Sequence, residues 1–166
     1  MRRTVVLIRH AKTHPAGLLQ RDYDRTLTGR GEQDAAAMGA RLHRRKLHPA
    51  LIIASPAKRT AQTAALIAAE TGCDSSSIRW EESLYQAPAA VFDRVIAAAP
   101  DDAATIFIIA HNPGITDFAN ELSSGFRIDN IPTCGIVAAA ADAAGWQGFA
   151  GAEKEILLFD YPKQQT

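Results

Sequence analysis

The stretch Thr4-Val5-Val6-Leu7-Ile8-Arg9-His10, near the start of the chain, sets the expected fold. Residues 4–8 are mostly β-branched and are apolar at odd and even positions alike, which predicts a central parallel strand buried on both faces. Arg9 and His10 interrupt this run long before it could form a signal-peptide core or span a bilayer. We therefore expect a buried strand with two polar residues at its carboxyl end, no membrane segment, and a cytoplasmic location by default.

Short β-branched runs alternate with longer runs rich in Ala, Leu, Arg and Glu along the rest of the chain. This alternation is typical of βαβ units. Ser55 is the expected N-cap of the second helix, with Pro56 in its first turn and Gly72 at its end, and Thr28 is a possible cap of the first helix. The same patterns predict strands at 51–54, 78–80, 105–110, 136–141 and 156–159, and helices at 31–46, 56–72, 91–99 and 115–122.

The last two predicted strands are separated by a Gly-rich segment that is too short for a crossover helix. They are therefore expected to pair antiparallel, at or near an edge of the sheet. No shift in composition and no repeat divides the chain. The prediction is one α/β domain over residues 1–166, a three-layer sandwich with a mostly parallel central sheet, helices on both faces and an antiparallel edge.

The charged residues balance, with 18 Lys and Arg against 18 Asp and Glu in 166 residues. A chain without a surplus of basic residues is not expected to bind nucleic acid or an anionic membrane, because both interactions depend on such a surplus. An anionic ligand would need a local cluster of cations, with the acids lying elsewhere. Cys73 and Cys134 are far apart and belong to no CxxC pair, so neither a zinc ribbon nor a disulfide is expected.

Polar residues follow several of the predicted strands, at the edge where ligands bind in open α/β sheets. Each of them alone has an ordinary explanation, such as a solvated turn or a core histidine with satisfied ring nitrogens. Their number at one edge favours a functional site. The residues are Arg9 and His10 after the first strand, Ser55, Lys58 and Arg59 after the second, Glu81 and Glu82 after the third, and His111 and Asn112 after the fourth.

Phosphate is the anion that this set fits best. Arg59 lies in the first turn of a predicted helix, where the helix dipole disfavours a cation unless an anion is bound there. Arginine forks match tetrahedral oxyanions, and the sequence has no phosphate-binding loop and no DxD-type carboxylates for magnesium, so we expect neither a metal nor a cofactor. A neutral imidazole among arginines is a suitable nucleophile toward phosphorus, because the cations disfavour its protonated form.

Four blocks of the sequence resemble the signatures of the histidine phosphatase superfamily, the phosphoglycerate-mutase-like proteins. The short length, the Arg9-His10-Ala11-Lys12 variant and the block from His111 to Ile115 are most similar to its SixA-type phosphohistidine phosphatase group. One departure is Ala11, which stands where many members have glycine and requires a backbone compatible with a Cβ. The blocks are Arg9 to Lys12, Leu27 to Gln33, Ser55 to Thr63 and Ala110 to Asn112.

The resemblance implies a role for each matching residue. His10 corresponds to the nucleophile that becomes phosphohistidine, Arg9 and Arg59 to the arginines that hold the phosphoryl oxygens, and His111 to the histidine that stabilises charge in the transition state. Ser55 and Asn112 are further candidates for phosphate binding. A general acid after the third strand is common in the superfamily, and Glu82 is the candidate here, with Glu81 as the second choice.

Three functions remain open at this point. The leading hypothesis is a metal-independent phosphatase whose substrate is phosphohistidine on a partner protein. The same mechanism could instead serve a small ester, such as a sugar phosphate or a nucleotide. A phosphate-recognition module without catalysis is disfavoured, because a binder has no need of a nucleophile. A metal site at His10, His14 and His111 is also disfavoured, because no carboxylate or cysteine lies at ligand spacing with them.

Overall fold

Residues 1–164, which the computed structural model describes, contain a six-stranded sheet with the order β3-β2-β4-β1-β5-β6. The first four strands along the chain are parallel to one another, and β5 is antiparallel to both β1 and β6. The predicted mostly parallel sheet with an antiparallel edge is therefore confirmed. The strands are β1 (Arg2–Arg9), β2 (Leu51–Ala54), β3 (Arg79–Trp80), β4 (Thr105–Ala110), β5 (Ile136–Asp142) and β6 (Glu155–Asp160).

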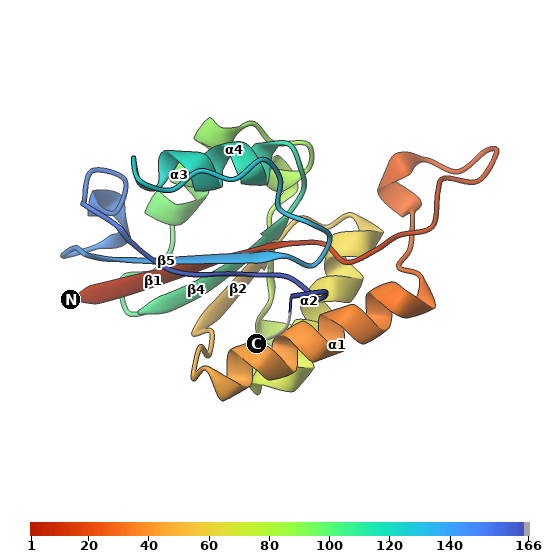
Figure 1. The fold of residues 1–166 in the computed structure, drawn as a ribbon, viewed down its shortest axis with the longest axis horizontal. Coiled ribbons are helices and arrows are strands. Elements are labelled where there is room, and N and C mark those ends of the chain that lie inside the picture. The colour runs from red at the N-terminus through yellow and green to blue at the C-terminus, as the bar shows by residue number, and fades with distance from the viewer. Residues whose placement is uncertain (165–166) are drawn as a thin grey trace.

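Helices cover both faces of the sheet, so the structure has the three layers that were predicted (Figure 1). The alternation within β1 explains this arrangement. Val6 and Ile8 belong to the apolar core under α1 and α2, whereas Val5 and Leu7 belong to the core under α3 and α4. The side chains at these four positions are fully buried. The helices are α1 (Gly29–Arg44), α2 (Lys58–Thr71), α3 (Ala89–Ala97) and α4 (Gly114–Glu121).

The helix ends follow the sequence signals with one exception. Thr28 caps α1 by accepting a hydrogen bond from the Gly31 N–H at 2.9 Å, and α2 ends at Gly72 in the left-handed conformation with a φ of 75°. The predicted start of α2 is wrong, because Ala57 is the N-cap and has no side-chain cap. The Ser55 hydroxyl is instead 2.8 Å from a ring nitrogen of His111. The shorter contact of Ser55 is therefore with a side chain that follows β4, and its contact with the Ala57 N–H at the start of its own helix is longer, at 3.4 Å.

The order of the strands explains why distant residues meet. β4 lies between β1 and β2, and all three strands run in the same direction. Their carboxyl ends are held together by the backbone, since the His10 N–H donates to Ala110 O at 3.2 Å and the Ser55 N–H donates to Ile109 O at 3.1 Å. The residues that follow these three strands must therefore lie at one edge of the sheet.

The turn between β4 and α4 is packed tightly against the segment that precedes α3. A Cβ added at Gly114 would overlap with the carbonyl oxygen of Ala87, so the two backbones can approach only because this residue is glycine. We expect Gly114→Ala to lower the free energy of unfolding by about 1–3 kcal/mol, the usual cost of overpacking. Urea denaturation measures the effect. Gly29→Ala is the matched control, because nothing lies within 4 Å of its Cβ, and equal effects in both variants would contradict the prediction.

None of the helices within residues 1–164 combines the length and the apolar character that crossing a membrane requires.

Candidate active site

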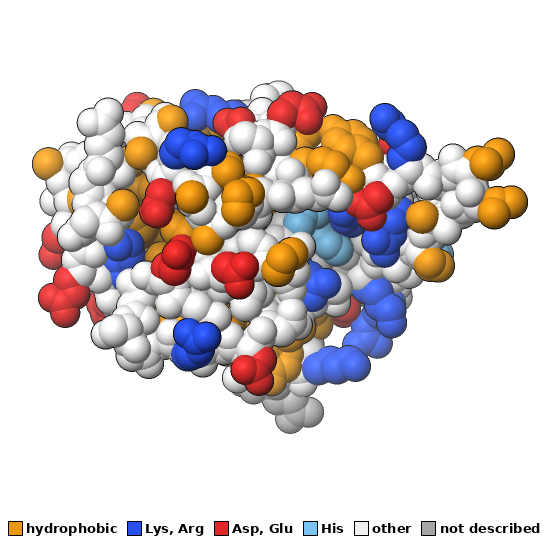
Figure 2. All heavy atoms as spheres, turned by 90° about the horizontal axis from the view of Figure 1, so that it is seen from above, with side chains coloured by type: hydrophobic (Ala, Val, Ile, Leu, Met, Phe, Trp, Pro, Cys, Tyr) orange, Lys and Arg blue, Asp and Glu red, His pale blue; other side chains and the backbone are white. Residues whose placement is uncertain are grey.

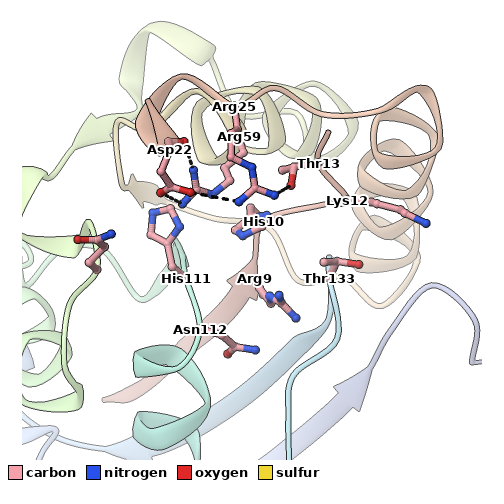
Figure 3. A pocket seen from close by; sticks show the side chains of 11 residues that line it. Arg9, His10, Lys12, Thr13, Asp22, Arg25, Arg59, His111, Asn112 and Thr133 are labelled. Carbon is pink, nitrogen blue, oxygen red and sulfur yellow. Dashed lines mark hydrogen bonds and ion pairs between the residues drawn. The ribbon is translucent and has the colours of Figure 1, made fainter. Parts of the chain in front are cut away.

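A hollow of about 460 Å³ lies at the carboxyl ends of β1 and β4, where the sequence predicted a site. Histidine side chains are visible in it, with Lys and Arg side chains beside them (Figure 2), and Figure 3 shows the lining residues from close by. We call this hollow the His10 pocket. Its lining residues are Arg9, His10, Lys12, Thr13, Asp22, Arg25, Arg59, Gln86, His111, Asn112 and Thr133.

The ring of His10 is held as a neutral imidazole. Its Nδ1 is 2.8 Å from the carbonyl oxygen of Ala11, which can only accept, so Nδ1 carries the proton and Nε2 keeps its lone pair. Burial lowers the pKa of His10 to about 4, and the positive charges of Arg59 and Arg9 contribute to the same shift. At neutral pH the ring therefore has a free lone pair on Nε2, which a nucleophile requires.

Ala11 fits its place beside His10 without strain. Its methyl group is fully buried in the core under α1 and α2, and its φ is not positive. Its N–H donates to the Thr63 hydroxyl of α2 at 3.0 Å. A glycine is therefore not needed at this position, and the backbone after His10 is fixed by α2.

His111 lies next to His10, with 5.5 Å between the ring centroids. Its Nε2 is 2.8 Å from the Ser55 hydroxyl, which can also accept the Ala57 N–H at 3.4 Å. A hydroxyl that accepts from Ala57 and donates to Nε2 leaves the proton of His111 on Nδ1. Burial lowers the pKa of His111 to about 3, with contributions from the Arg59 and His10 charges. Ser55 is fully buried and does not line the pocket, so it orients His111 rather than contacting a phosphate.

Unpaired donors converge in this pocket. Among residues 1–164, the buried side-chain nitrogen and oxygen atoms without a partner in the protein are Arg9 Nε, Arg59 Nε and His111 Nδ1. A buried polar atom without a partner costs about 1–3 kcal/mol, so proteins rarely leave three of them together. All three belong to residues that line the His10 pocket. This clustering points to a ligand that accepts hydrogen bonds, as the oxygens of a phosphoryl group do.

Asp22 and Arg25 are residues of the pocket that the sequence reasoning missed. The Asp22 carboxylate accepts from Arg59 Nη2 at 2.9 Å, from the Tyr85 hydroxyl at 2.8 Å and from Arg25 Nη1 at 3.1 Å. Burial alone would raise the pKa of Asp22, but these hydrogen bonds outweigh it and lower the pKa to about 2. The expectation that the acids lie away from the cations is therefore wrong at Asp22. The charged run of residues 21–25, between the first strand and the cap of the first helix, was the available signal.

Glu82 lies outside the His10 pocket, whereas Asn112 lines it with its amide group already hydrogen-bonded within the protein. Glu82 is exposed at the start of a short 3-10 turn and faces a neighbouring hollow with Arg21, not the His10 pocket. Asn112 lines the pocket, but its amide nitrogen donates to Asn130 Oδ1 and Ile131 O, and its oxygen accepts from the Thr116 hydroxyl. Asn112 therefore fastens the loop before β5. The second choice for the acid, Glu81, accepts from Ser83 and does not line the pocket.

Both cysteines are free thiols, and the one nearer to the pocket is Cys134. Cys134 is fully buried behind His10, donating its N–H to His10 O at 2.9 Å, and burial raises the pKa of its thiol to about 12. That thiol stays protonated and is no competing nucleophile. Within residues 1–164 no three side chains of His, Cys, Asp or Glu are arranged to hold a metal ion.

The two buried histidines predict a loss of stability in mild acid. Their pKa values lie near 4 and 3 in the folded protein, below the ordinary value of 6.5. Below pH 6.5 the unfolded chain binds protons that the folded protein does not, so unfolding becomes more favourable as the pH falls. We expect each histidine to lower the free energy of unfolding by about 2 kcal/mol between pH 7 and pH 5. Urea denaturation at both pH values tests this, and a double His10→Gln, His111→Gln variant should lose most of the dependence; an unchanged dependence would contradict it.

Comparison with known proteins agrees with this geometry. The sequence pattern of the Histidine phosphatase superfamily (branch 1) matches residues 5–87. An uncharacterised protein of Mycobacterium leprae is 31% identical over 170 residues, which cover 94% of this chain and 100% of that protein. The structure of a proposed phosphohistidine phosphatase SixA from Nakamurella multipartitia is similar, with a TM-score of 0.84, 27% identity and coverage of 99% and 98%. Another from Agrobacterium tumefaciens shares the fold, with a TM-score of 0.80, 23% identity and coverage of 96% and 98%.

Proposed function

Because the chain belongs to the histidine phosphatase superfamily, we propose that it hydrolyses phosphohistidine on a partner protein through a phosphohistidine intermediate on His10. One observation supports this substrate above others. Within residues 1–164, Asp22 is the only carboxylic acid that lines the His10 pocket, and its pKa is about 2. An acid of this strength, held by two arginines and a tyrosine, is ionised at neutral pH and has no proton to donate.

The absence of a protonated carboxylic acid from the described pocket selects among leaving groups. An alkyl ester releases an alkoxide, which needs a general acid, and such an acid contributes about 10²–10⁴-fold to the rate. Phosphohistidine can release a neutral imidazole, because the ring nitrogen that does not carry the phosphoryl group has an ordinary pKa of about 6.5 and takes a proton from solvent near neutral pH. The pocket therefore suits a phosphoramidate better than a sugar phosphate.

In the first step of the proposed reaction, the Nε2 lone pair of His10 attacks phosphorus in line with the leaving group. The Nε2–P bond forms while the bond from phosphorus to the substrate nitrogen breaks, and that nitrogen keeps the bonding electrons. The substrate ring departs as a neutral imidazole, because its other nitrogen has already taken a proton from solvent. Arg9, Arg59 and Arg25 hold the phosphoryl oxygens, and Nδ1–H of His111 donates to one of them. These groups are oriented before the substrate arrives, so they stabilise the developing charge without reorganising.

In the second step a water molecule attacks the phosphorus of phospho-His10. The P–Nε2 bond breaks, His10 recovers its lone pair, and inorganic phosphate leaves with the water oxygen. The hydrogen bond from Nδ1 to Ala11 O keeps the ring in the same orientation through both steps. The arginines supply the charge that neutralises the phosphoryl group, so a chelator is expected to leave turnover unchanged.

A series of substrates with different leaving groups tests the proposal. We expect a phosphohistidine protein and aryl phosphates with good leaving groups to be hydrolysed, and alkyl phosphates to react at least about 100-fold more slowly, because no protein acid assists them. The measurement is kcat/KM for each compound against the pKa of its leaving group. Equal rates for aryl and alkyl phosphates would contradict the assignment of phosphohistidine and favour the small-ester alternative.

A second measurement separates catalysis from simple binding. A phosphatase that works through His10 becomes transiently labelled when it is mixed with a labelled phosphoryl donor, and the label is lost in acid because a phosphorus–nitrogen bond is acid-labile. A phosphate-recognition module would bind the donor without acquiring covalent label. Absence of both label and turnover with every donor tested would overturn the proposed function.

A further inference from the structure

A second hollow of about 430 Å³ adjoins the His10 pocket. The two share Lys12 and Thr133 in their walls, so a molecule in one can extend into the other. We call this second hollow the Lys163 hollow. Its other lining residues are Arg30, Asp34, Pro132, Tyr161, Pro162 and Lys163.

The walls of the Lys163 hollow are held in place by contacts within the fold. On one side the carbonyl oxygen of Lys12 accepts the Thr28 N–H at 2.9 Å, which ties the segment after β1 to the start of α1. On the other side Arg41 of α1 donates to the nearly buried Asp160 at 3.1 Å, to Tyr161 O at 3.0 Å and to Pro162 O at 2.9 Å. The short segment that carries Lys163 is therefore fixed against the same helix as Lys12.

The charge of the Lys163 hollow is positive. It is lined by three cationic side chains, Lys12, Arg30 and Lys163, and by one carboxylate, Asp34. That carboxylate is engaged by Arg30 Nε at 3.0 Å. Figure 3 shows the Lys12 side chain pointing away from His10 and past Thr133. In a chain with no net charge, positive charge thus continues from the His10 pocket into the space beside it.

We propose that the Lys163 hollow binds a second anionic group of the phosphorylated substrate, a carboxylate or a phosphate, while the phosphoryl group lies in the His10 pocket. This inference rests on the proposed function, because it assumes that the His10 pocket receives the phosphoryl group. The second anion has two chemical sources. It is either an acidic side chain close to the phosphohistidine of a polypeptide, or an acid on the same small molecule as the phosphate.

Non-hydrolysable ligands test the hollow without relying on turnover. We would compare alkylphosphonates with ω-carboxyalkylphosphonates of the same length, over a series of increasing chain lengths, by calorimetry at low salt. The carboxylate should improve binding by about fivefold once the chain is long enough to reach the hollow, and the gain should shrink as salt is added, as for other exposed ion pairs. A gain that is absent at every length would overturn the inference.

Charge reversal at Lys163 tests whether the tighter binding of the carboxylated phosphonates arises in the Lys163 hollow. Lys163 is exposed and does not line the His10 pocket, so Lys163→Glu should remove the preference for the carboxylate and leave binding of the plain alkylphosphonates unchanged. Lys46→Glu is the matched control, because Lys46 is an exposed lysine that follows the far end of α1. A preference that survives in Lys163→Glu, or that falls equally in Lys46→Glu, would contradict the proposal.

Turnover then distinguishes the two sources of the second anion. Phosphohistidine peptides with Asp or Glu beside the phosphorylated residue are compared with the same peptides carrying Asn or Gln, and a carboxylated aryl phosphate is compared with its methyl ester. For the pair that represents the physiological source, we expect the neutral compound to have a kcat/KM about fivefold lower than the acidic one, because its KM is higher. The Lys163→Glu variant should no longer show this difference. If an unsubstituted aryl phosphate is hydrolysed but the two members of each pair react equally, binding of a second anion in the Lys163 hollow is ruled out and the proposed function stands. If no compound is hydrolysed, the proposed function is wrong, and the phosphonate series still tests whether the Lys163 hollow binds a second anion.

Discussion

The His10→Ala variant should lose at least about 10⁴-fold in kcat/KM toward an aryl phosphate, the scale seen when a covalent nucleophile is removed. His10 is the ring in the pocket whose Nδ1 proton is committed to a carbonyl, so its Nε2 lone pair is free to attack. The other imidazole of the pocket, His111, has its Nε2 against Ser55 and cannot take over without breaking that contact. Initial rates at saturating and at limiting substrate give kcat and kcat/KM for the variant and for the unchanged protein.

His14→Ala is the control for this variant. His14 is an exposed histidine near the pocket, and its contacts to Thr26 and Arg25 are made by its backbone. Its replacement should leave both the rate and the acid-labile label unchanged. The label itself should appear in the unchanged protein and be missing in His10→Ala. Label on a protein without His10, or turnover that persists in it, would show that another residue carries the phosphoryl group.

The part of the site that could be predicted from the sequence depends on local patterns and on strand order. Residues 4–8 and 105–110 are almost entirely apolar at odd and even positions, which is typical of strands in the middle of a sheet that is covered on both faces. Once those strands are parallel neighbours, Arg9, His10 and His111 must meet at their carboxyl ends. The structure confirms that these residues and Arg59 line one pocket.

The residues that were missed or misplaced depend on contacts between distant segments. Asp22 lies in a segment without helical or strand periodicity, and its place is set by hydrogen bonds to Arg59 and Tyr85, which are 37 and 63 residues away. Glu82 follows the third strand as predicted, but a 3-10 turn begins there and directs it to a different hollow. No pattern in the sequence specifies which way a side chain in such a turn points.

The start of α2 shows the same limit in a different form. Ser-Pro is a common helix opening, and the sequence offers no reason to reject Ser55 as the cap. The Ser55 hydroxyl, however, makes its short contact with His111, whose ring is nearly buried and needs a partner at Nε2. The Nε2 of His111 would otherwise be buried without a partner, at a cost of about 1–3 kcal/mol, and the contact with Ser55 avoids that cost. The competition is visible only when both segments are in place.

Replacing Arg59 should produce the second large loss, and the choice of replacement separates its two contributions. Arg59 is nearly buried, bonds the backbone and carboxylate of Asp22, and keeps Nε unpaired. Arg59→Met keeps an apolar side chain but removes the guanidinium group and its charge. Arg59→Lys keeps the positive charge but loses the paired N–H donors of the guanidinium group. Both variants should lose about 100-fold to 1000-fold in kcat/KM, because a preorganised donor to the phosphoryl group is missing in each. Arg44→Met, at an exposed arginine in the last turn of α1, is the control.

The pH dependence of kcat/KM distinguishes the two Arg59 variants. Protonated His10 has no lone pair, so the rate should fall as the pH drops through the pKa of His10, which is about 4 in the unchanged protein. The positive charge of Arg59 is one of the causes of that low value, so Arg59→Met should raise the pKa of His10 and move the fall in rate to higher pH. Burial, the larger cause, remains, so the fall should stay below the ordinary histidine value of 6.5. Arg59→Lys should leave the acid limb near its original place, because the cation is kept. An acid limb that does not move in Arg59→Met, or that moves equally in Arg59→Lys, would mean that Arg59 does not hold His10 neutral by its charge.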